Sequence, residues 1–547
     1  MWRSSRLGEL RVGESMAPEL ALINGKLHTQ DPDAPNATSV AIADRRFVAV
    51  GDDASVEPLL GPNTRVIDLG GRRVLPGLTD AHFHFHRWAI SRMRLPLHDT
   101  PSLPGLRDRV REAATVTRPG GWVVGQGWNE TRWPEPRIPT RVDLDQAAPE
   151  HPVLLWRSDM HLAVANTRAL QEAGIDRERP NPPQGRIDRD ASGTPTGVLR
   201  ELAINVVQES IPSPPEDQLV EAMREGIGLL HRLGLTGVHD HRLMGGTDGP
   251  QALRAYQRLP SLGGLSLRLW TGIGGEQLDE AIALGLRTGF GDDYLRVGHV
   301  KLFADGSQGA RTAWMLEPYE DTGDCGMPMT PLEEIAEAVR KAGQAGLAVA
   351  VHAIGDRANR ELITVFEQHV GSASIAVPHR IEHLQIVRPE DVRRLARLGM
   401  VASVQPIHLT DDIPLCGASI GSRCRFAYPF RDLLDAGVTL AFGSDAPVAS
   451  PNPLWGIHAA VTRQGRDGRP EGGWYPEQRL TPAEAVWAYT MGPAIASGRE
   501  GTLGSITPGK LADLVVLDRD ILAIDPSEIH QARATMTIVG GEVVYDA

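Results

Sequence analysis

The 547-residue sequence has few cysteines, few aromatic residues and no long apolar run, and these shortages exclude several classes of protein. Three scattered cysteines are too few for a disulfide framework, which favours free thiols and a reducing cytoplasm over a metal clip at Cys416 and Cys424. No segment approaches the roughly 20 apolar residues of a membrane helix, so we expect a soluble protein without a membrane partner. A net charge of -13, without any basic stretch, argues against nucleic acid as a partner.

The two ends of the chain share a residue pattern that differs from that of the middle. Residues 1–17 are polar and lack the apolar core of a secretory signal, so we expect a disordered leader. Residues 18–72 and 500–547 contain short alternating strands broken by Gly, Asn and Asp, which predicts one composite β lobe built from both termini.

Apolar strand-like runs alternate with helical segments between these ends, in residues 73–499. Eight runs qualify as buried strands, at 74–84, 235–240, 265–273, 299–306, 347–356, 379–384, 400–406 and 438–447. This pattern predicts an α/β fold, a TIM-type (β/α)8 barrel whose active site lies at the C-terminal ends of the strands. A long insert over residues 90–230, after the first barrel strand, is expected to cover the barrel mouth.

The stretch LPGLTDAHFHFHRW, residues 75–88, places His82, His84 and His86 on alternate positions. Neighbours about 6.6 Å apart on one face of a strand can lean inward onto one metal ion, whereas residues twice as far apart cannot. The spacing therefore allows His82 with His84, or His84 with His86, and does not choose between them. A packed or solvated strand end is the alternative.

Other metal-capable side chains fall at the predicted strand ends. His352 and His383 each close an apolar run, and Asp445 follows another, two residues before Pro447. Each alone could be a buried, hydrogen-bonded histidine or a helix-capping aspartate. Their joint placement at the same end of the barrel favours a metal site.

Lys301 is one of only four lysines, and the strand HVKLFADG directs it into the barrel. Burying an unpaired ammonium group costs several kcal/mol. We therefore expect Lys301 either to pair with a carboxylate such as Asp305 or Asp445, or to react with CO₂ and become an anionic carbamate that bridges two metal ions.

These residues together resemble the amidohydrolase superfamily, with its urease-like composite β lobe. The segments 75–84, 125–145, 300–313, 351–359, 380–385 and 443–448 are more narrowly similar to amidohydrolase family 3, which includes N-substituted formamide deformylase. The resemblance spans roughly residues 20–545. It implies a metal-dependent hydrolase that cleaves a linear C–N bond in an amide, formamide or N-acyl compound by attack of metal-bound hydroxide.

Carried over by position, the resemblance assigns residues to this chemistry. It makes His82 and His84 the chelating pair, His352 and His383 further ligands, and Lys301 a carbamylated bridge between two divalent ions, with zinc expected. Asp445 becomes a ligand that also takes the proton of the attacking water. The extra His86 departs from the family pattern. A homodimer is expected because dimers are frequent among such enzymes.

The sequence says less about the substrate. The resemblance suggests that His161, in the insert, reaches over the barrel mouth as a substrate ligand, although a packed loop histidine is an equal reading. Arg311 could hold a carboxylate or tie down its loop. A deaminase of nitrogen heterocycles on the same barrel is an alternative, opposed by Lys301 and by Asp356 standing where a glutamate is typical. A binding protein on an inactive barrel is opposed by the intact ligand set.

Overall fold

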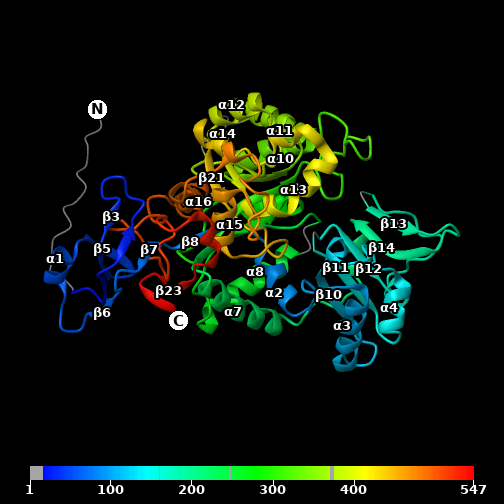
Figure 1. Cartoon of the computed structure of the whole chain (residues 1–547), viewed down its shortest axis with the longest axis horizontal. Coiled ribbons are helices and arrows are strands. Elements are labelled where there is room, and N and C mark those ends of the chain that lie inside the picture. The colour runs from blue at the N-terminus through cyan, green and yellow to red at the C-terminus, as the bar shows by residue number, and fades with distance from the viewer. Residues whose placement is uncertain (1–16, 159, 184, 246–247, 370–374) are drawn as a thin grey trace.

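Eight parallel strands form a barrel at the centre of the computed structural model, which describes residues 17–158, 160–183, 185–245, 248–369 and 375–547 (Figure 1). The strands follow one another around the sheet in chain order. They are β8 (Leu78–Phe83), β15 (Leu235–Asp240), β16 (Arg268–Gly274), β17 (Leu295–Phe303), β18 (Val349–Ala353), β19 (Arg380–His383), β20 (Val401–Val404) and β21 (Thr439–Phe442). Each lies within or overlaps one of the eight predicted runs, and the predicted TIM-like barrel is confirmed.

The barrel closes between its first and last strands. Phe83 forms a parallel bridge with Ala446, the Asp445 amide donates to the His82 carbonyl at 2.7 Å, and the His84 amide donates to the Ala446 carbonyl at 2.9 Å. These bonds hold the segment after β21 directly against the end of β8. Two of the predicted ligand positions are thereby fixed to each other through the backbone.

Helices pack around the outside of the barrel and bury their apolar sides against it. Those of the barrel region are α2 (Phe85–Arg92), α7 (Glu216–Arg232), α8 (Asp248–Arg258), α9 (Leu278–Ala283), α10 (Leu332–Ala345), α11 (Asp356–His369), α12 (Pro389–Arg397), α13 (Pro406–Ile420), α14 (Phe430–Asp435), α15 (Pro453–Thr462) and α16 (Pro482–Ala496). Local sequence sets their ends. Thr481 and Glu484 form a capping box at the start of α16, and Gly346, at φ 78°, ends α10 in the left-handed conformation that glycine tolerates.

Strands from both ends of the chain share one sheet beside the barrel, at the left of Figure 1. Its order is β24 (Glu542–Asp546), β23 (Ala534–Val539), β22 (Leu514–Leu517), β7 (Arg73–Pro76), β2 (Lys26–His28) and β3 (Asn36–Ala37). A second sheet has the order β5 (Arg46–Gly51), β4 (Ser39–Ala43), β1 (Leu20–Ile23) and β6 (Arg65–Asp68), and α1 (Asp53–Val56) contacts β4 and β5. Arg73–Pro76 therefore pairs with β22, although the sequence groups it with the barrel. The leader expected at 1–17 lies, except for Ala17, outside the described residues.

The insert folds as a separate sheet with its own core, at the right of Figure 1. Its strands are β13 (Gly185–Arg189), β14 (Pro195–Glu201), β12 (Leu162–Ala165), β11 (Val153–Arg157), β10 (Val123–Trp128) and β9 (Leu95–Pro96), with helices α3 (Leu103–Val116), α4 (Arg141–Ala147), α5 (Thr167–Glu172) and α6 (Ala203–Gln208). Helix α7, which falls within the predicted range 90–230, instead packs Leu219, Met223 and Leu230 into the main core.

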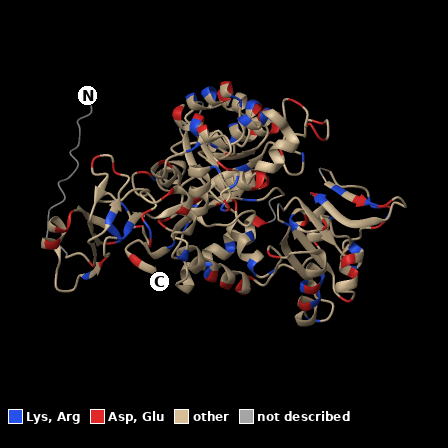
Figure 2. Cartoon of the chain, viewed as in Figure 1, with Lys and Arg blue, Asp and Glu red and all other residues tan. Residues whose placement is uncertain are grey.

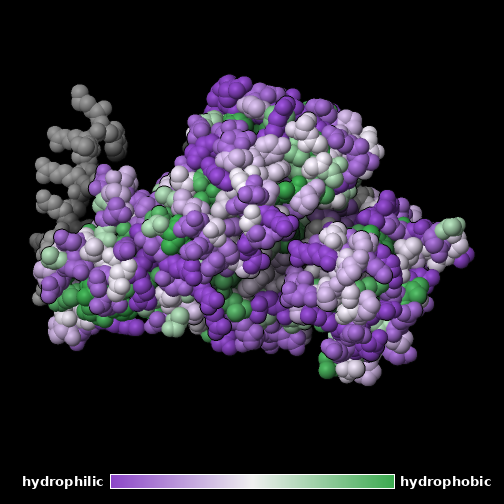
Figure 3. Space-filling model, in the orientation of Figure 1, coloured by the Kyte–Doolittle hydropathy of each residue, from purple (hydrophilic) through white to green (hydrophobic). Residues whose placement is uncertain are grey.

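The outer surface carries mixed charge. Figure 2 shows acidic and basic residues interspersed along the outer helices, and the face in Figure 3 is largely hydrophilic with small apolar areas. Within the described residues, we find no helix with the length and apolar character needed to cross a lipid bilayer.

Candidate metal centre

Six buried side chains predicted from the sequence gather at the C-terminal ends of the barrel strands. The His82 ring lies 5.3 Å from that of His84 and 4.8 Å from that of His383, and His383 lies 4.4 Å from His352, between ring centres. Nitrogen or oxygen atoms of His82, His383 and Asp445 all fall within 4.8 Å of one another, a spacing that a single metal ion can span. Lys301 acts electrostatically on His82, His352 and His383, so it belongs to the same group.

Asp445 is turned toward the histidines by an unusual backbone conformation. Its φ is 59°, and that of His383 is 73°, so both lie in the left-handed region that residues other than glycine rarely adopt. Asp445 Oδ1 is 3.0 Å from His84 Nε2 and 3.4 Å from His82 Nε2. Backbone strain held by the surrounding structure at converging polar groups is typical of functional sites.

Each of the four imidazoles has one ring nitrogen bound to an oxygen that can only accept a hydrogen. The pairs are His82 Nδ1 with Glu382 Oε2 at 2.5 Å, His84 Nδ1 with the His241 carbonyl at 2.9 Å, His352 Nε2 with the Gly306 carbonyl at 3.0 Å, and His383 Nδ1 with Gln405 Oε1 at 2.7 Å. The bound nitrogen must therefore carry the proton. The opposite nitrogen keeps a lone pair, which is the form that ligates a metal.

Lone pairs face each other where Asp445 meets His82. His82 Nε2 and Asp445 Oδ1 are both buried and neither has a hydrogen-bond partner. Burial, followed by the charge of Lys301, holds the pKa of His82 well below its ordinary value, so a proton does not resolve the contact. A cation between these atoms would satisfy both, and nitrogen and oxygen donors together suit zinc. The residues present thus fit a divalent metal.

Lys301 is almost fully buried, at 2% exposure, and burial lowers its pKa to about 8. Its Nζ lies 5.0 Å from the centre of the Phe303 ring, and among the described residues it forms no ion pair. Asp305, one carboxylate that the sequence offered as a partner, instead accepts backbone hydrogen bonds from Trp314, Ile354 and Gly355. A substantial fraction of Lys301 is therefore neutral amine near pH 8, the form that reacts with CO₂.

Two buried residues that sequence reasoning missed lie beneath the site. Glu382 accepts from His82 and forms an ion pair with Arg380 at 2.5 Å, with both side chains wholly buried. Burial alone would raise the pKa of Glu382, but the charges of Arg380, His241 and Lys301 and a hydrogen bond from Ser403 together outweigh burial and hold that pKa well below its ordinary value. His241 Nε2 is 3.7 Å from Glu382 Oε1, and His82, His241 and Glu382 form a second potential metal-binding group.

Glu382 orients His82 through the hydrogen bond to Nδ1, so Glu382→Gln should weaken metal binding. Loss of such a supporting carboxylate lowers metal affinity by about 10- to 100-fold. Competition with a chromogenic chelator measures this affinity directly. Glu390→Gln, which changes an exposed partner of Arg360, is the matched control and should leave the affinity unchanged. Equal zinc affinities for Glu382→Gln and wild type would show that the contact does not support a ligand.

The structure gives the other two sequence-predicted histidines different surroundings from the six. His86 lies in α2, not on the strand, and is buried near Asp248, with its pKa lowered to about 4 mainly by burial. His161 Nδ1 contacts Glu201 at 2.8 Å, and its charge contributes to lowering the pKa of His352, which places the insert near the site.

Arg311 is held by its own loop. Its guanidinium makes two hydrogen bonds to Asp321 Oδ2, at 2.9 and 2.6 Å, and one to the Gln308 carbonyl at 2.7 Å. This is the loop-tying role that the sequence left open, and within the described part of the chain no hydrogen bond or ion pair joins Arg311 to the histidines.

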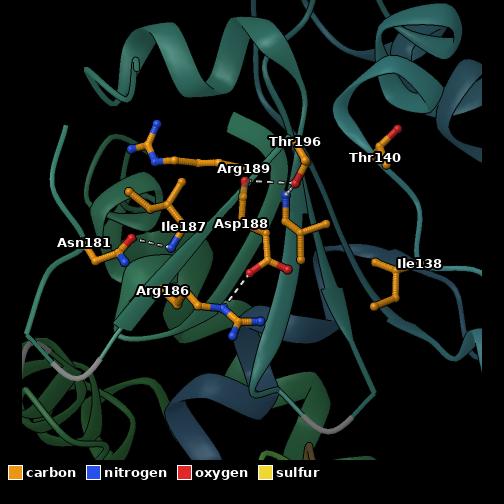
Figure 4. Close-up of a pocket in the computed structure, with 9 residues that line it drawn as sticks. Ile138, Thr140, Asn181, Arg186, Ile187, Asp188, Arg189 and Thr196 are labelled. Atoms are coloured by element: carbon orange, nitrogen blue, oxygen red, sulfur yellow. Dashed lines mark hydrogen bonds and ion pairs between the residues drawn. The ribbon is translucent and has the colours of Figure 1, made fainter. Parts of the chain in front are cut away.

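A separate pocket lies on the sheet of the insert (Figure 4). Its polar side chains bond to one another or to the backbone, as in the 2.8 Å contact between Arg186 and Asp188 and the bond from Ile187 N to Asn181 Oδ1. It holds none of the predicted ligands.

Residues 65–545 match the model of the amidohydrolase family. The protein YtcJ of Bacillus subtilis (strain 168) is 32% identical over 526 residues, covering 95% of this chain and 98% of that protein. The N-substituted formamide deformylase of Arthrobacter pascens is 28% identical, and the match covers 96% of this chain and 98% of that protein. An uncharacterized metal-dependent hydrolase from Pyrococcus horikoshii OT3, known from its crystal structure, is 28% identical in sequence, with a TM-score of 0.76. The match covers 93% of this chain and 99% of that chain. The chain therefore belongs to the amidohydrolase family and is a hydrolase acting on carbon–nitrogen bonds.

Proposed function

We propose that this protein hydrolyses a linear C–N bond in an amide, formamide or N-acyl compound, with a divalent metal held by His82, His84, Lys301, His352, His383 and Asp445. The observation that carries the proposal is the set of four imidazoles, each with one nitrogen fixed as a donor to the protein and the other left with a lone pair. The similarity to a deformylase of N-substituted formamides supports a linear amide as the substrate.

Lys301 is proposed to act as a carbamate. Its neutral amine nitrogen attacks the carbon of CO₂ and releases one proton, which converts a buried cation into an anion with two oxygen donors. Burial favours this conversion because it lowers the pKa of the amine to about 8. An anion at this position can bridge two ions, for which zinc suits the mixed nitrogen and oxygen donors.

Asp445 is proposed to move the proton in the reaction. A bound divalent metal would lower the pKa of a water molecule toward 7 and polarise the substrate carbonyl. Asp445, within 3.4 Å of both chelating histidines, would accept the proton of the attacking water. It would then donate this proton to the leaving nitrogen, so that amide and water yield a carboxylic acid and an amine.

Removal of metal is expected to lower the rate of hydrolysis of N-substituted formamides and N-acyl amines by a factor on the order of 1000 or more. The reason is that the metal supplies several kcal/mol of transition-state stabilisation. The measurement is amine release by purified protein before chelation, after chelation and after zinc is restored. Hydrolysis that persists in metal-free protein would contradict the proposal. Ammonia release from nitrogen heterocycles, without cleavage of linear amides, would favour the deaminase alternative.

A further inference from the structure

Two shielded guanidinium groups, Arg87 on helix α2 and Arg94 two residues beyond its end, have no carboxylate in contact with them among the described residues. Nε and one terminal nitrogen of Arg87, and one terminal nitrogen of Arg94, are shielded from solvent and form no hydrogen bond. Neither arginine forms an ion pair among the described residues. Burial lowers the pKa of Arg87 to about 10, and burial together with the charge of Arg87 lowers that of Arg94 to about 9.

The surroundings of Arg87 offer further donors and few acceptors. Its guanidinium lies 4.6 Å from the ring centre of Trp156, on strand β11 of the insert, and Trp156 Nε1 is also buried without a partner. Gln126, on the neighbouring strand β10, pairs in register with Trp156, and its side-chain oxygen Oε1 is a buried acceptor without a hydrogen-bond partner. A single amide oxygen cannot satisfy two guanidinium groups and an indole.

The nearby acidic residues Asp248 and Asp445 face other side chains and form no ion pair with Arg87. Asp248 and Asp445 act on Arg87 only through space, and neither makes a contact with it. Asp248 pairs with Arg242 at 3.4 Å, and Asp445 faces His82 and His84. The positive charge of Arg87 is therefore offset only through space, and among the described residues neither Arg87 nor Arg94 forms an ion pair.

The position of these donors relates them to the reaction. Helix α2 begins at Phe85, immediately after His84, so Arg87 lies one turn from a proposed metal ligand and its field reaches Asp445. An anion bound here would sit next to a substrate whose carbonyl lies at the metal centre.

We propose that Arg87 and Arg94, with Trp156 Nε1, form a subsite for an anionic group of the substrate, so that the hydrolysed amide carries a carboxylate close to the scissile bond. This inference rests on the proposed function. A carboxylate would accept two parallel hydrogen bonds from a guanidinium and remove the cost of a buried, unpaired cation. A neutral analogue would leave these donors unsatisfied and would be rejected.

The test compares N-formylphenylalanine with its neutral counterpart N-formylphenylalaninamide on the zinc-loaded protein. Calorimetry gives the affinity of each compound, and kcat/KM is measured as well for any compound that is hydrolysed. We expect wild type to prefer the carboxylate by about 10-fold or more. Arg87→Gln should weaken carboxylate binding by about 10- to 100-fold while changing binding of the amide less than about 3-fold, as expected for one charge-assisted contact.

Arg92→Gln is the matched control, because Arg92 lies exposed on the same helix with its guanidinium over Trp88. Arg87→Lys keeps the charge but cannot donate two parallel hydrogen bonds, so it should retain part of the preference for the carboxylate compound. A partial preference in this variant would show that the loss in Arg87→Gln does not come from misfolding. Equal affinity of wild type for the two compounds, or equal losses for both in Arg87→Gln, would overturn the subsite. Inorganic phosphate that binds through Arg87 without competing with N-formylphenylalanine would also overturn it, by assigning the site to a free anion. Because binding needs no turnover, failure of hydrolysis alone would count against the proposed function and not against the subsite.

Discussion

Lys301→Ala is expected to lose most of the bound metal and to lower hydrolytic activity by a factor on the order of 1000 or more, as removal of metal does. The substitution removes the only side chain of the six that can supply a bridging carbamate, and the four histidines and Asp445 would then have to hold the metal without it. Short carboxylates such as formate, acetate or propionate should restore part of the activity, because they can enter the space left by the side chain and provide the missing oxygens. Metal content by elemental analysis and activity with and without these additives are the two measurements.

Lys341→Ala controls for the loss of a lysine. Lys341 lies on the surface, where it contacts Asp279 at 3.1 Å, so its removal should change neither metal content nor activity. The thermal stability of metal-free Lys301→Ala provides a second check. Removing an unpaired, buried amine relieves a cost to folding, so a loss of activity should not come with a large loss of stability. Full activity of Lys301→Ala without added carboxylate would rule out the bridge.

The barrel could be predicted from the sequence because buried parallel strands are apolar almost throughout. Runs such as LAVAVH and VTLAF are too short and too rich in branched residues for helices, and helical segments separate them. His352, His383 and Asp445 were recognisable because each follows such a run closely, whereas His82 and His84 stood out by their alternate spacing and Lys301 as a rare lysine inside a strand. Position at the strand end places a residue near the barrel mouth whatever the conformation of the residues that follow.

Glu382 and His241 escaped prediction because the alternation of side chains along a strand misleads at these positions. Glu382 immediately precedes His383, and strict alternation would send their side chains to opposite faces. His383 has a left-handed backbone, so the alternation fails there and both side chains contribute to the site. His241 lies one residue beyond β15, where the sequence gives no periodic signal.

The arginines in and just after α2 illustrate a second limit of the sequence. Nothing in the local sequence distinguishes Arg87 and Arg94 from ordinary solvated arginines. Trp156, on a strand of the insert, packs against the Arg87 guanidinium, and this contact joins segments about 70 residues apart. Long-range contacts of this kind depend on how the insert docks, which local patterns do not specify.

Asp445→Asn is expected to lower kcat by about 100- to 10,000-fold, the range associated with loss of a positioned acid or base. The amide has nearly the same size and can still accept a hydrogen bond, but it cannot take a proton from water. Asp411→Asn, an exposed aspartate on α13, is the matched control. Rates are compared per bound metal, since Asp445 is also a proposed ligand. If Asp445 returns the proton to the leaving nitrogen, the loss should be smaller for a nitroanilide, whose leaving amine needs less protonation, than for an alkylamide. A variant with full metal content and less than about a 10-fold loss in kcat for both substrates would show that another group moves the proton.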